Sequence, residues 1–282
     1  MVLVALMWSI AGVVTRQLES ARSFEVTFWR SFFTVLSLLA ILPLWQGLGV
    51  FRKMPWRNRA FWISGVCWSV MFTAFMVAIM LTTVANVLVT LALGPFFTAL
   101  LARIVNGYRI PGRTWFAIAM AGAGIAWMYG GQTDFGSHLG GTLVALMVPL
   151  AGASNWTVVQ HSHAQGQNID LVPAVLLGAV ISSLVTLPLS LPFAATPHDM
   201  GWLALLGLVQ LAIPCVLSVL CANVLKAPEV ALLALLEVIF GILLAWLGAN
   251  EVPGPNVLTG GALVISALVV NELIGWRQRS CR

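Results

Sequence analysis

Long apolar runs separated by short polar links make up most of this sequence. Most of the runs approach the roughly 20 apolar residues that an α-helix needs to cross a bilayer. Ten segments can be delimited by hydropathy and by turn residues between them. They predict an all-α polytopic membrane protein with ten transmembrane helices. The segments are Met1–Thr15, Glu25–Leu44, Ala60–Leu81, Ala85–Ala102, Thr114–Gly130, Gly140–Val159, Leu171–Leu191, Gly201–Leu225, Pro228–Leu247 and Asn256–Trp276.

The composition excludes an ordinary soluble fold. The 282 residues are 60% hydrophobic and 8% charged, whereas a soluble domain carries about 25% charged residues. The apolar runs are continuous rather than alternating, which favours helices over a transmembrane barrel. The first run leads directly into the second, so we expect no cleavable signal peptide.

The basic residues gather on one predicted side of the membrane. Of the fourteen Lys and Arg residues, eleven fall in links on that side, and such an excess marks the cytoplasmic face. We therefore expect a multi-pass protein of a bacterial inner (cell) membrane with both termini in the cytoplasm. This distribution explains the net charge of +5 without nucleic acid as a partner. The eleven are Arg52, Lys53, Arg57, Arg59, Arg103, Arg109, Arg113, Lys226, Arg277, Arg279 and Arg282.

The sequence lacks the residues that several classes of function require. Neither lysine follows a glycine-rich loop, so we expect no P-loop and no ATPase subunit. A membrane protease or metal enzyme would need an HExxH motif or paired acids within the apolar runs, and neither occurs. We therefore expect no enzyme, no cofactor and no metal. The four cysteines show no ligand spacing and are interpreted as buried hydrophobic residues: Cys67, Cys215, Cys221 and Cys281.

The two halves of the sequence are related. Asn86–Ala102 aligns without gaps on Glu229–Ala245, with matching Leu, Phe and Ala positions. An odd number of helices in each half gives the two copies opposite orientations, and inverted repeats of this kind recur in secondary transporters. We predict a first five-helix repeat over 1–130 and a second over 139–282, with the substrate site between them at the midplane.

Motifs in these related segments resemble the EamA-type carriers of the drug/metabolite transporter superfamily. The first runs over Ala78–Asn86 and continues in Leu93–Leu101, and the second runs over Cys221–Pro228 and continues in Leu235–Phe240. The resemblance covers essentially the whole chain and implies export of small organic solutes. The many tryptophans and the scarcity of cavity cations are most similar to the YddG-type exporters of aromatic and other neutral amino acids.

Glu237 is the single charged residue in the apolar run Val230–Gly248. A carboxylate at membrane depth costs roughly 2.5–3.5 kcal/mol and usually faces a cavity, a pathway or a partner. Two interpretations stay open. Glu237 either binds a substrate ammonium or exchanges a proton, or it packs as a protonated acid against a neighbouring helix. Val238 replaces a proline common in the family, so a kink is expected to be stronger at Pro95 than here.

An aromatic face is predicted on the third helix. Trp68, Phe72 and Met76 recur at four-residue spacing, which places them along one side. Trp8 and Trp156 can meet this face between the repeats, where rings suit apolar side chains or hold a cation. Core packing or contact with lipid is the alternative interpretation.

Polar residues at membrane depth complete the predicted cavity. Thr90 is one of them, and Asn155 and Gln210 are favoured because an amide offers a zwitterion both donor and acceptor. Hydrogen bonding between helices is the alternative. Arg30 can bind a substrate carboxylate, but a structural pairing with Glu25 or with a backbone carbonyl is favoured.

These features predict a secondary transporter that exports small neutral solutes, above all aromatic and other neutral amino acids, by alternating access. An exporter of lipophilic cations that uses Glu237 is the alternative, and a membrane enzyme or scaffold is a further one. The expected partners are the transported solute and the lipid bilayer, and the protein is expected to be a monomer or weak homodimer. The predicted cavity residues are Trp8, Trp68, Phe72, Thr90, Asn155, Trp156, Gln210 and Glu237.

Overall fold

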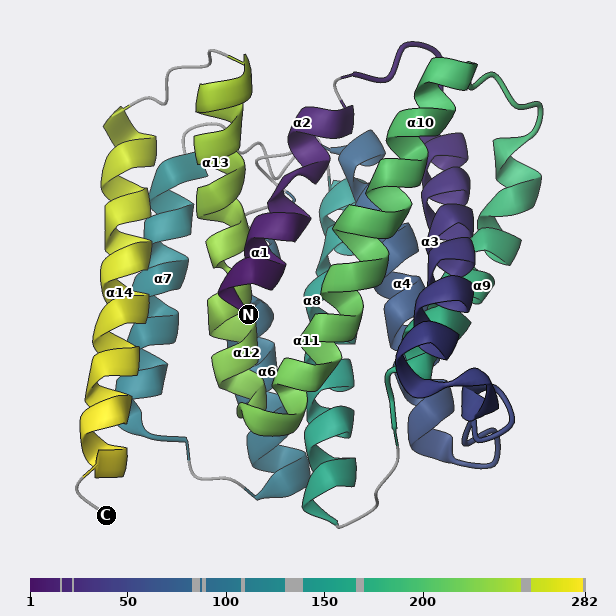
Figure 1. Ribbon diagram of the computed structural model, residues 1–282. Coiled ribbons are helices and arrows are strands. Elements are labelled where there is room, and N and C mark those ends of the chain that lie inside the picture. Colours follow the sequence, from purple (N-terminus) through teal and green to yellow (C-terminus); the bar gives the residue numbers. More distant parts are fainter. Residues whose placement is uncertain are drawn as a thin grey trace.

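The computed structural model describes residues 1–282 except 16, 22, 83–86, 88–89, 108–109, 130–138, 166–169, 250–254 and 281–282. The described ranges hold helices and no strand, and the long helices run side by side in a bundle (Figure 1). The protein is an all-helical polytopic membrane protein, as predicted. In chain order the helices are α1 (Val2–Ser9), α2 (Ala11–Thr15), α3 (Ser23–Gln46), the short 3-10 turn η1 (Leu48–Val50), α4 (Arg59–Leu81), α6 (Gly94–Asn106), α7 (Gly112–Tyr129), α8 (Leu139–Ala164), α9 (Pro173–Ser190), α10 (Pro197–Leu205), the π-helical turn η3 (Leu206–Ala212), α11 (Ile213–Val224), α12 (Ala227–Ala234), α13 (Leu236–Ala249) and α14 (Pro255–Ser280).

Length and composition identify the helices that can cross a membrane alone. Five described stretches qualify: Phe24–Gln46, Arg59–Ala78, Leu139–Ala164, Pro173–Ser190 and Pro197–Val224. Shorter apolar helices complete the bundle. One predicted end is wrong, because α8 continues past Val159 to Ala164 and so includes His161 and His163. The reason is that hydropathy marks the end of an apolar run, whereas a helix continues into polar sequence beyond it.

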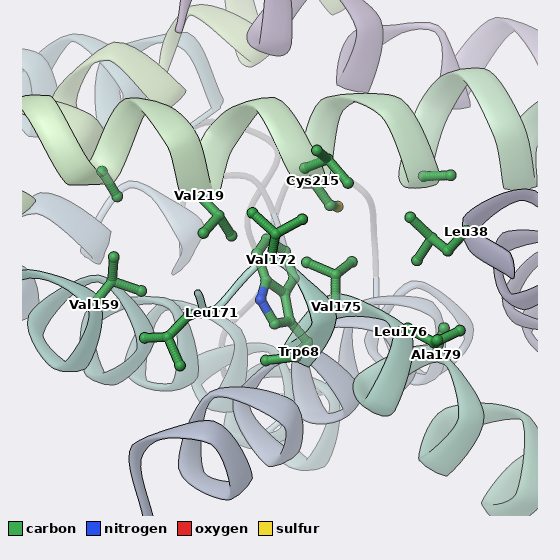
Figure 2. Packing of buried hydrophobic residues seen from close by; sticks show 14 of the residues in the cluster. Leu38, Trp68, Val159, Leu171, Val172, Val175, Leu176, Ala179, Cys215 and Val219 are labelled. Carbon is green, nitrogen blue, oxygen red and sulfur yellow. The ribbon is translucent and has the colours of Figure 1, made fainter. Parts of the chain in front are cut away.

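The largest buried cluster lies between α3, α4, α8, α9 and α11. Trp68 of α4 is 2% exposed and packs among Val172 just before α9, Val175 of α9 and Cys215 of α11 (Figure 2). Cys67 and Cys215 are free and buried, as predicted for hydrophobic cysteines. Cys221 is also free but only partly buried, which differs from the prediction, and Cys281 lies outside the described residues.

Glycines bring the helix backbones into close contact. A Cβ atom on Gly178 of α9 would clash with Trp68 and lie 2.9 Å from the carbonyl oxygen of Gly65 in α4. At Gly124 of α7, a Cβ would lie 2.8 Å from the carbonyl oxygen of Gly260 in α14. Lipid is as apolar as these side chains, so helices associate through close packing rather than through the hydrophobic effect.

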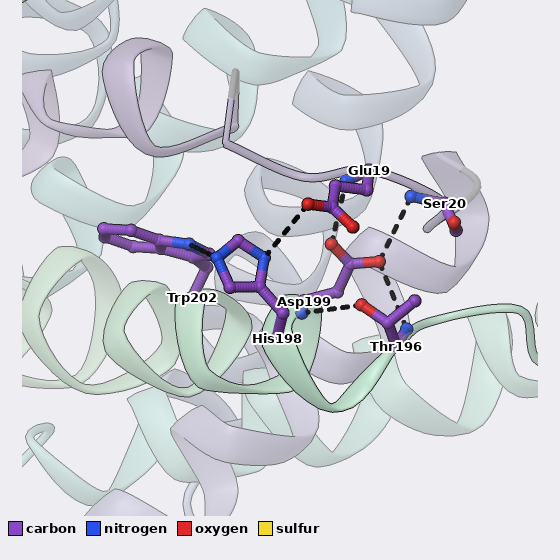
Figure 3. A network of polar contacts seen from close by, with 6 residues as sticks. All are labelled: Glu19, Ser20, Thr196, His198, Asp199 and Trp202. Carbon is purple, nitrogen blue, oxygen red and sulfur yellow. Dashed lines mark hydrogen bonds and ion pairs between the residues drawn. The ribbon is translucent and has the colours of Figure 1, made fainter.

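Two carboxylates tie the links at the end of the bundle where α3 and α10 begin. Asp199, fully buried in the first turn of α10, accepts hydrogen bonds from the backbone N–H groups of Glu19 (2.8 Å) and Ser20 (3.2 Å) (Figure 3). It also forms a capping box with Thr196, whose hydroxyl oxygen accepts from the Asp199 N–H at 3.1 Å. The link between α2 and α3 is therefore bonded to α10.

The second carboxylate holds the link between α9 and α10. Glu25, fully buried in the first turn of α3, accepts hydrogen bonds from the backbone N–H groups of Ala194 and Ala195 at 2.8–3.0 Å. At the opposite end, Gln46 of α3 donates to Asp170 just before α9, at 2.7 Å. α3 is thus bonded at both ends to the links that flank α9, and Glu25 satisfies two backbone N–H groups of the link after α9.

The packing at Gly178 generates a stability prediction. We expect Gly178→Ala to destabilise the protein by about 1–3 kcal/mol, because the new methyl group forces Trp68 or the α4 backbone to move. Gly122→Ala in α7 is the matched control, since a Cβ there meets no atom within 4 Å. Thermal unfolding in one detergent compares the two variants. Equal melting temperatures would contradict close packing of α4 on α9.

Candidate functional site

A cavity lies at the centre of the bundle, lined by residues from both halves of the chain. It contains about 1000 Å³ of empty space, counting its opening to solvent. Its walls come from α1, α3, α4, α6, α8, η3, α11, α12 and α13. Aromatic and aliphatic side chains dominate the lining, which is typical of a binding site for a small organic molecule.

The structure brings six of the eight predicted residues together around this cavity. Thr90 is buried but does not line it. Asn155 is fully buried, and its Oδ1 accepts a 2.6 Å hydrogen bond from the hydroxyl of Ser64. Asn155 therefore takes part in the contact between α8 and α4, which was the alternative interpretation. The six that line the cavity are Trp8, Trp68, Phe72, Trp156, Gln210 and Glu237.

The aromatic wall is built around Trp68. The centroid of its ring lies 5.6 Å from the centroid of the Phe72 ring. It meets Trp156 edge to face, with 5.6 Å between the ring centroids and 85° between the ring planes. Trp8 and Phe75 also line the cavity. Met76, predicted on the same face, packs instead with Leu203 and Leu206 in a separate cluster, because the face of α4 turns away from the cavity there.

Two helices are interrupted where they border the cavity. Before α6, the N–H of Leu93 bonds back to the carbonyl of Thr90 at 3.1 Å, and the helix restarts at Gly94. Between α12 and α13, Leu235 forms the same kind of tight turn. Leu93 is equivalent to Leu236 in the gap-free alignment of the halves, so both breaks fall at related positions. Irregular backbone at membrane depth is tolerated where it lines a cavity.

Proline accounts for one of these breaks and not for the other. Pro95 lies at the start of α6, where the missing N–H is not needed. In α13 the equivalent residue is Val238, yet the helix is interrupted there too. The tight turn at Leu235, with the Val238 N–H bonded to the Leu235 carbonyl at 3.1 Å, is therefore set by packing around the cavity.

Glu237 lies in the first turn of α13, just after the break. It lines the cavity and is only partly buried. Within the described part of the chain its carboxylate has no hydrogen bond and no ion pair. The N-terminal end of a helix favours a negative charge at this place. A carboxylate positioned in this way is available to a ligand.

Arg30 of α3 lines the same cavity and is 2% exposed. Its Nη2 donates to the backbone carbonyl of Phe72 at 3.2 Å, and its buried Nε has no partner among the described residues. The predicted bond to a backbone carbonyl is confirmed, but Glu25 bonds elsewhere. Sequence reasoning favoured a structural role and left Arg30 out of the cavity, because a lone arginine near a helix end usually extends to the interface.

Gln210 enters the cavity from the π-helical turn η3. Here the N–H of Ile213 bonds to the carbonyl of Leu208, one residue further back than in an α-helix. Pro214 explains this turn, because its ring would clash with the carbonyl four residues earlier, that of Gln210. Thr34 of α3 donates to the carbonyl of Gly207 at 3.1 Å and so holds the turn against α3.

Polar atoms without partners cluster around this cavity. Besides Nε of Arg30, they include Nε1 of Trp68 and Oε1 of Gln210, all buried and unpaired within the described ranges. Buried polar atoms are nearly always hydrogen-bonded in native proteins. Donors and an acceptor without partners among the described residues therefore surround one largely apolar cavity.

The fold and this site define a class: a polytopic helical membrane protein with a central cavity lined by residues from both parts of the chain. Comparison with known proteins adds a family for part of the chain, because residues 1–130 match the EamA-like transporter family. A crystal structure that is 17% identical covers 96% of this chain and 95% of its own, with a TM-score of 0.79. That likeness shows the fold alone. No curated protein matches the sequence.

Access to the cavity can be tested by cysteine labelling. In a cysteine-free background, we expect Ala234→Cys, which lines the cavity, to react readily with a small water-soluble thiosulfonate. Ala179→Cys should resist it, because Ala179 is fully buried in the core and does not line the cavity. Labelling is followed by mass spectrometry of the folded protein. Equal labelling of both variants would contradict the assignment of the cavity.

Proposed function

We propose that this protein is a secondary transporter of the drug/metabolite transporter type, which exports neutral and especially aromatic amino acids through the central cavity. One observation carries the proposal: Glu237, whose carboxylate has no hydrogen bond or ion pair with a described residue, and the guanidinium of Arg30 line the same aromatic cavity. The match of residues 1–130 to the EamA-like transporter family supports the transporter class and argues against an enzyme.

The polar groups of the cavity suit a zwitterion. The ammonium of an α-amino acid would bind the carboxylate of Glu237 and Oε1 of Gln210, both acceptors. Its carboxylate would bind the donors of Arg30 and Trp68. A bulky apolar side chain would pack against the aromatic wall. Doubly charged anions such as sugar phosphates are disfavoured, because among the described lining residues one guanidinium, Arg30, is accompanied by one carboxylate, Glu237.

Helix contacts support two inverted five-helix repeats over 1–130 and 139–282. In the proposed repeats α1 is equivalent to α8, α3 to α9, and α4 to the segment formed by η3 and α11. α4 contacts α8 and α9, and in the same way α11 contacts α1 and η3 contacts α3. α6 contacts α8, and its counterpart is α13 against α1. Three further contacts join a membrane span of the first repeat to the equivalent span of the second: α3 with α9, α6 with α12 and α7 with α14. Rocking of such halves around a midplane site gives alternating access.

The orientation follows from the sequence alone. We place the protein in a bacterial inner membrane with both termini in the cytoplasm, because basic residues gather at one end of the bundle. A monomer or weak homodimer that needs no ATPase subunit fits this proposal.

A second candidate function is export of lipophilic cations. The same free carboxylate of Glu237 favours it, since the neighbouring tryptophan faces attract cations as well. In this case Arg30 would contribute nothing to binding and would oppose it by charge repulsion.

The proposal is tested by reconstitution into liposomes loaded with labelled amino acids, with and without an imposed pH gradient. We expect release of Phe, Trp or Thr. Release that needs the gradient would indicate proton coupling. Release of a lipophilic cation but of no amino acid would favour the second candidate, and no flux across a broad panel of solutes would favour an enzyme or scaffold.

Charge variants separate the two candidates. Arg30→Gln should lower amino-acid flux about tenfold or more, because a charge-assisted hydrogen bond of roughly 1.5–3 kcal/mol is lost, and should spare cation flux. Glu237→Gln should lower both fluxes. Arg103→Gln, at an exposed position outside the cavity, is the control in liposomes with matched protein content. Full amino-acid flux in both cavity variants would refute the zwitterion site.

The aromatic wall gives a separate prediction. Trp68→Ala and Trp156→Ala should lower transport without lowering the amount of protein in the membrane, because the substrate loses its apolar contact. Trp62→Ala, an outward-facing residue of the same α4 that is 44% exposed, should transport normally. Unchanged flux in both cavity variants would remove the aromatic cavity from the mechanism.

A further inference from the structure

A second pocket lies at the basic end of the bundle, separate from the central cavity. It contains about 430 Å³ of empty space, counting its opening to solvent. It forms where the last turns of α6 and α8 meet the first turns of α7 and α12 (Figure 1). Its polar lining consists of Arg113, Thr114, Gln160, Lys226 and Glu229. Ala102, Ile110 and two prolines form an apolar side.

Arg113 supplies this pocket with a guanidinium that has no acidic partner among the described residues. Its one hydrogen bond to a described residue is a long one, from Nη1 to the backbone carbonyl of Asn271 in α14 at 3.4 Å. Its Nε is buried and has no partner in the described part of the chain. The adjacent Thr114 donates to Oδ1 of the same Asn271 at 3.3 Å. α14 thus fixes the position of Arg113 without neutralising its charge.

The other polar residues add further donors. The ammonium of Lys226 forms no ion pair with a described residue. Gln160 uses its Oε1 to accept from the N–H of Ala227 at 3.3 Å, which leaves its amide N–H groups for the pocket. Glu229 is already engaged, since its Oε2 accepts from the N–H of Lys226 at 3.3 Å as a helix cap. Two positive charges therefore face one engaged carboxylate.

This pattern of donors matches an oxyanion. Arginine binds phosphate oxygens through a planar fork of N–H groups, and lysine adds a mobile charge. The first turns of α7 and α12 direct N–H groups toward the same end, which favours negative charge further. The pocket also lies where α7 and α12 begin. The ends of membrane-spanning helices lie near lipid headgroups, and basic pockets between such helices suit anionic headgroups.

We propose that this pocket binds the phosphodiester headgroup of an anionic phospholipid. Arg113 and Lys226 contact the phosphate, Gln160 donates to a headgroup oxygen, and the glycerol backbone lies against the side formed by Ala102 and Ile110. The ligand bridges the link before α7 in the first half of the chain and the start of α12 in the second. This site is independent of the transported solute.

The test uses purified, delipidated full-length protein. Native mass spectrometry measures the Kd for phosphatidylglycerol and for phosphatidylcholine with the same acyl chains, and thermal unfolding measures stabilisation by each lipid and by inorganic phosphate. We expect phosphatidylglycerol to bind and stabilise preferentially. Arg113→Gln and Lys226→Gln should each weaken it about tenfold, because each removes a charge-assisted bond. Lys226 is exposed, so its variant is expected to fold.

Arg103→Gln is the matched control, because Arg103 is an exposed residue in the last turn of α6, at the same end but outside the pocket. It should bind phosphatidylglycerol as the parent protein does. An equal loss in Arg103→Gln would overturn the proposal in favour of diffuse surface attraction. Equal binding of both lipids would also overturn it. Inorganic phosphate that binds as tightly as the lipid would assign the pocket to a soluble phosphate instead.

Discussion

Peptide groups inside a bilayer have no water to bond, so a helix can be interrupted at depth only where a cavity or another group compensates. Three interruptions in this bundle border the central cavity: the one before Gly94, the one at Leu235 and the π-helical turn that carries Gln210. The same requirement that keeps the rest of the chain helical therefore concentrates irregular backbone in one place. Glu237 and Gln210 project into the cavity because they belong to these interruptions.

The two proposed repeats differ in their charge pattern. Gly94 stands at the position equivalent to Glu237 in the aligned segments, so the second half supplies a carboxylate where the first supplies only a helix terminus. Arg30 adds the opposite charge from α3 of the first half. Aromatic rings come from both halves, through Trp68 and Trp156. Similar folds can hence bind different solutes when single residues at the breaks change.

Much of the fold and part of the site could be predicted from the sequence. Hydropathy located the helices, the four-residue spacing placed Trp68 and Phe72 on one face, and an isolated charge singled out Glu237. Hydropathy reports burial without saying whether lipid, protein or a cavity surrounds a residue. It therefore could not distinguish Asn155, which is hydrogen-bonded to Ser64 between two helices, from Gln210, which lines the cavity. The break at Leu235 also escaped prediction, because neither proline nor glycine marks it and only tertiary packing imposes it.

The hydrogen bonds of Asp199 have a consequence for motion. They join residues 19 and 20, from the first half of the chain, to the start of α10 in the second. If the halves rock, this link must either travel with α10 or release two bonds to a buried carboxylate. The boundary between moving bodies therefore need not coincide with the boundary between the repeats. As long as these bonds hold, the link before α3 moves together with α10.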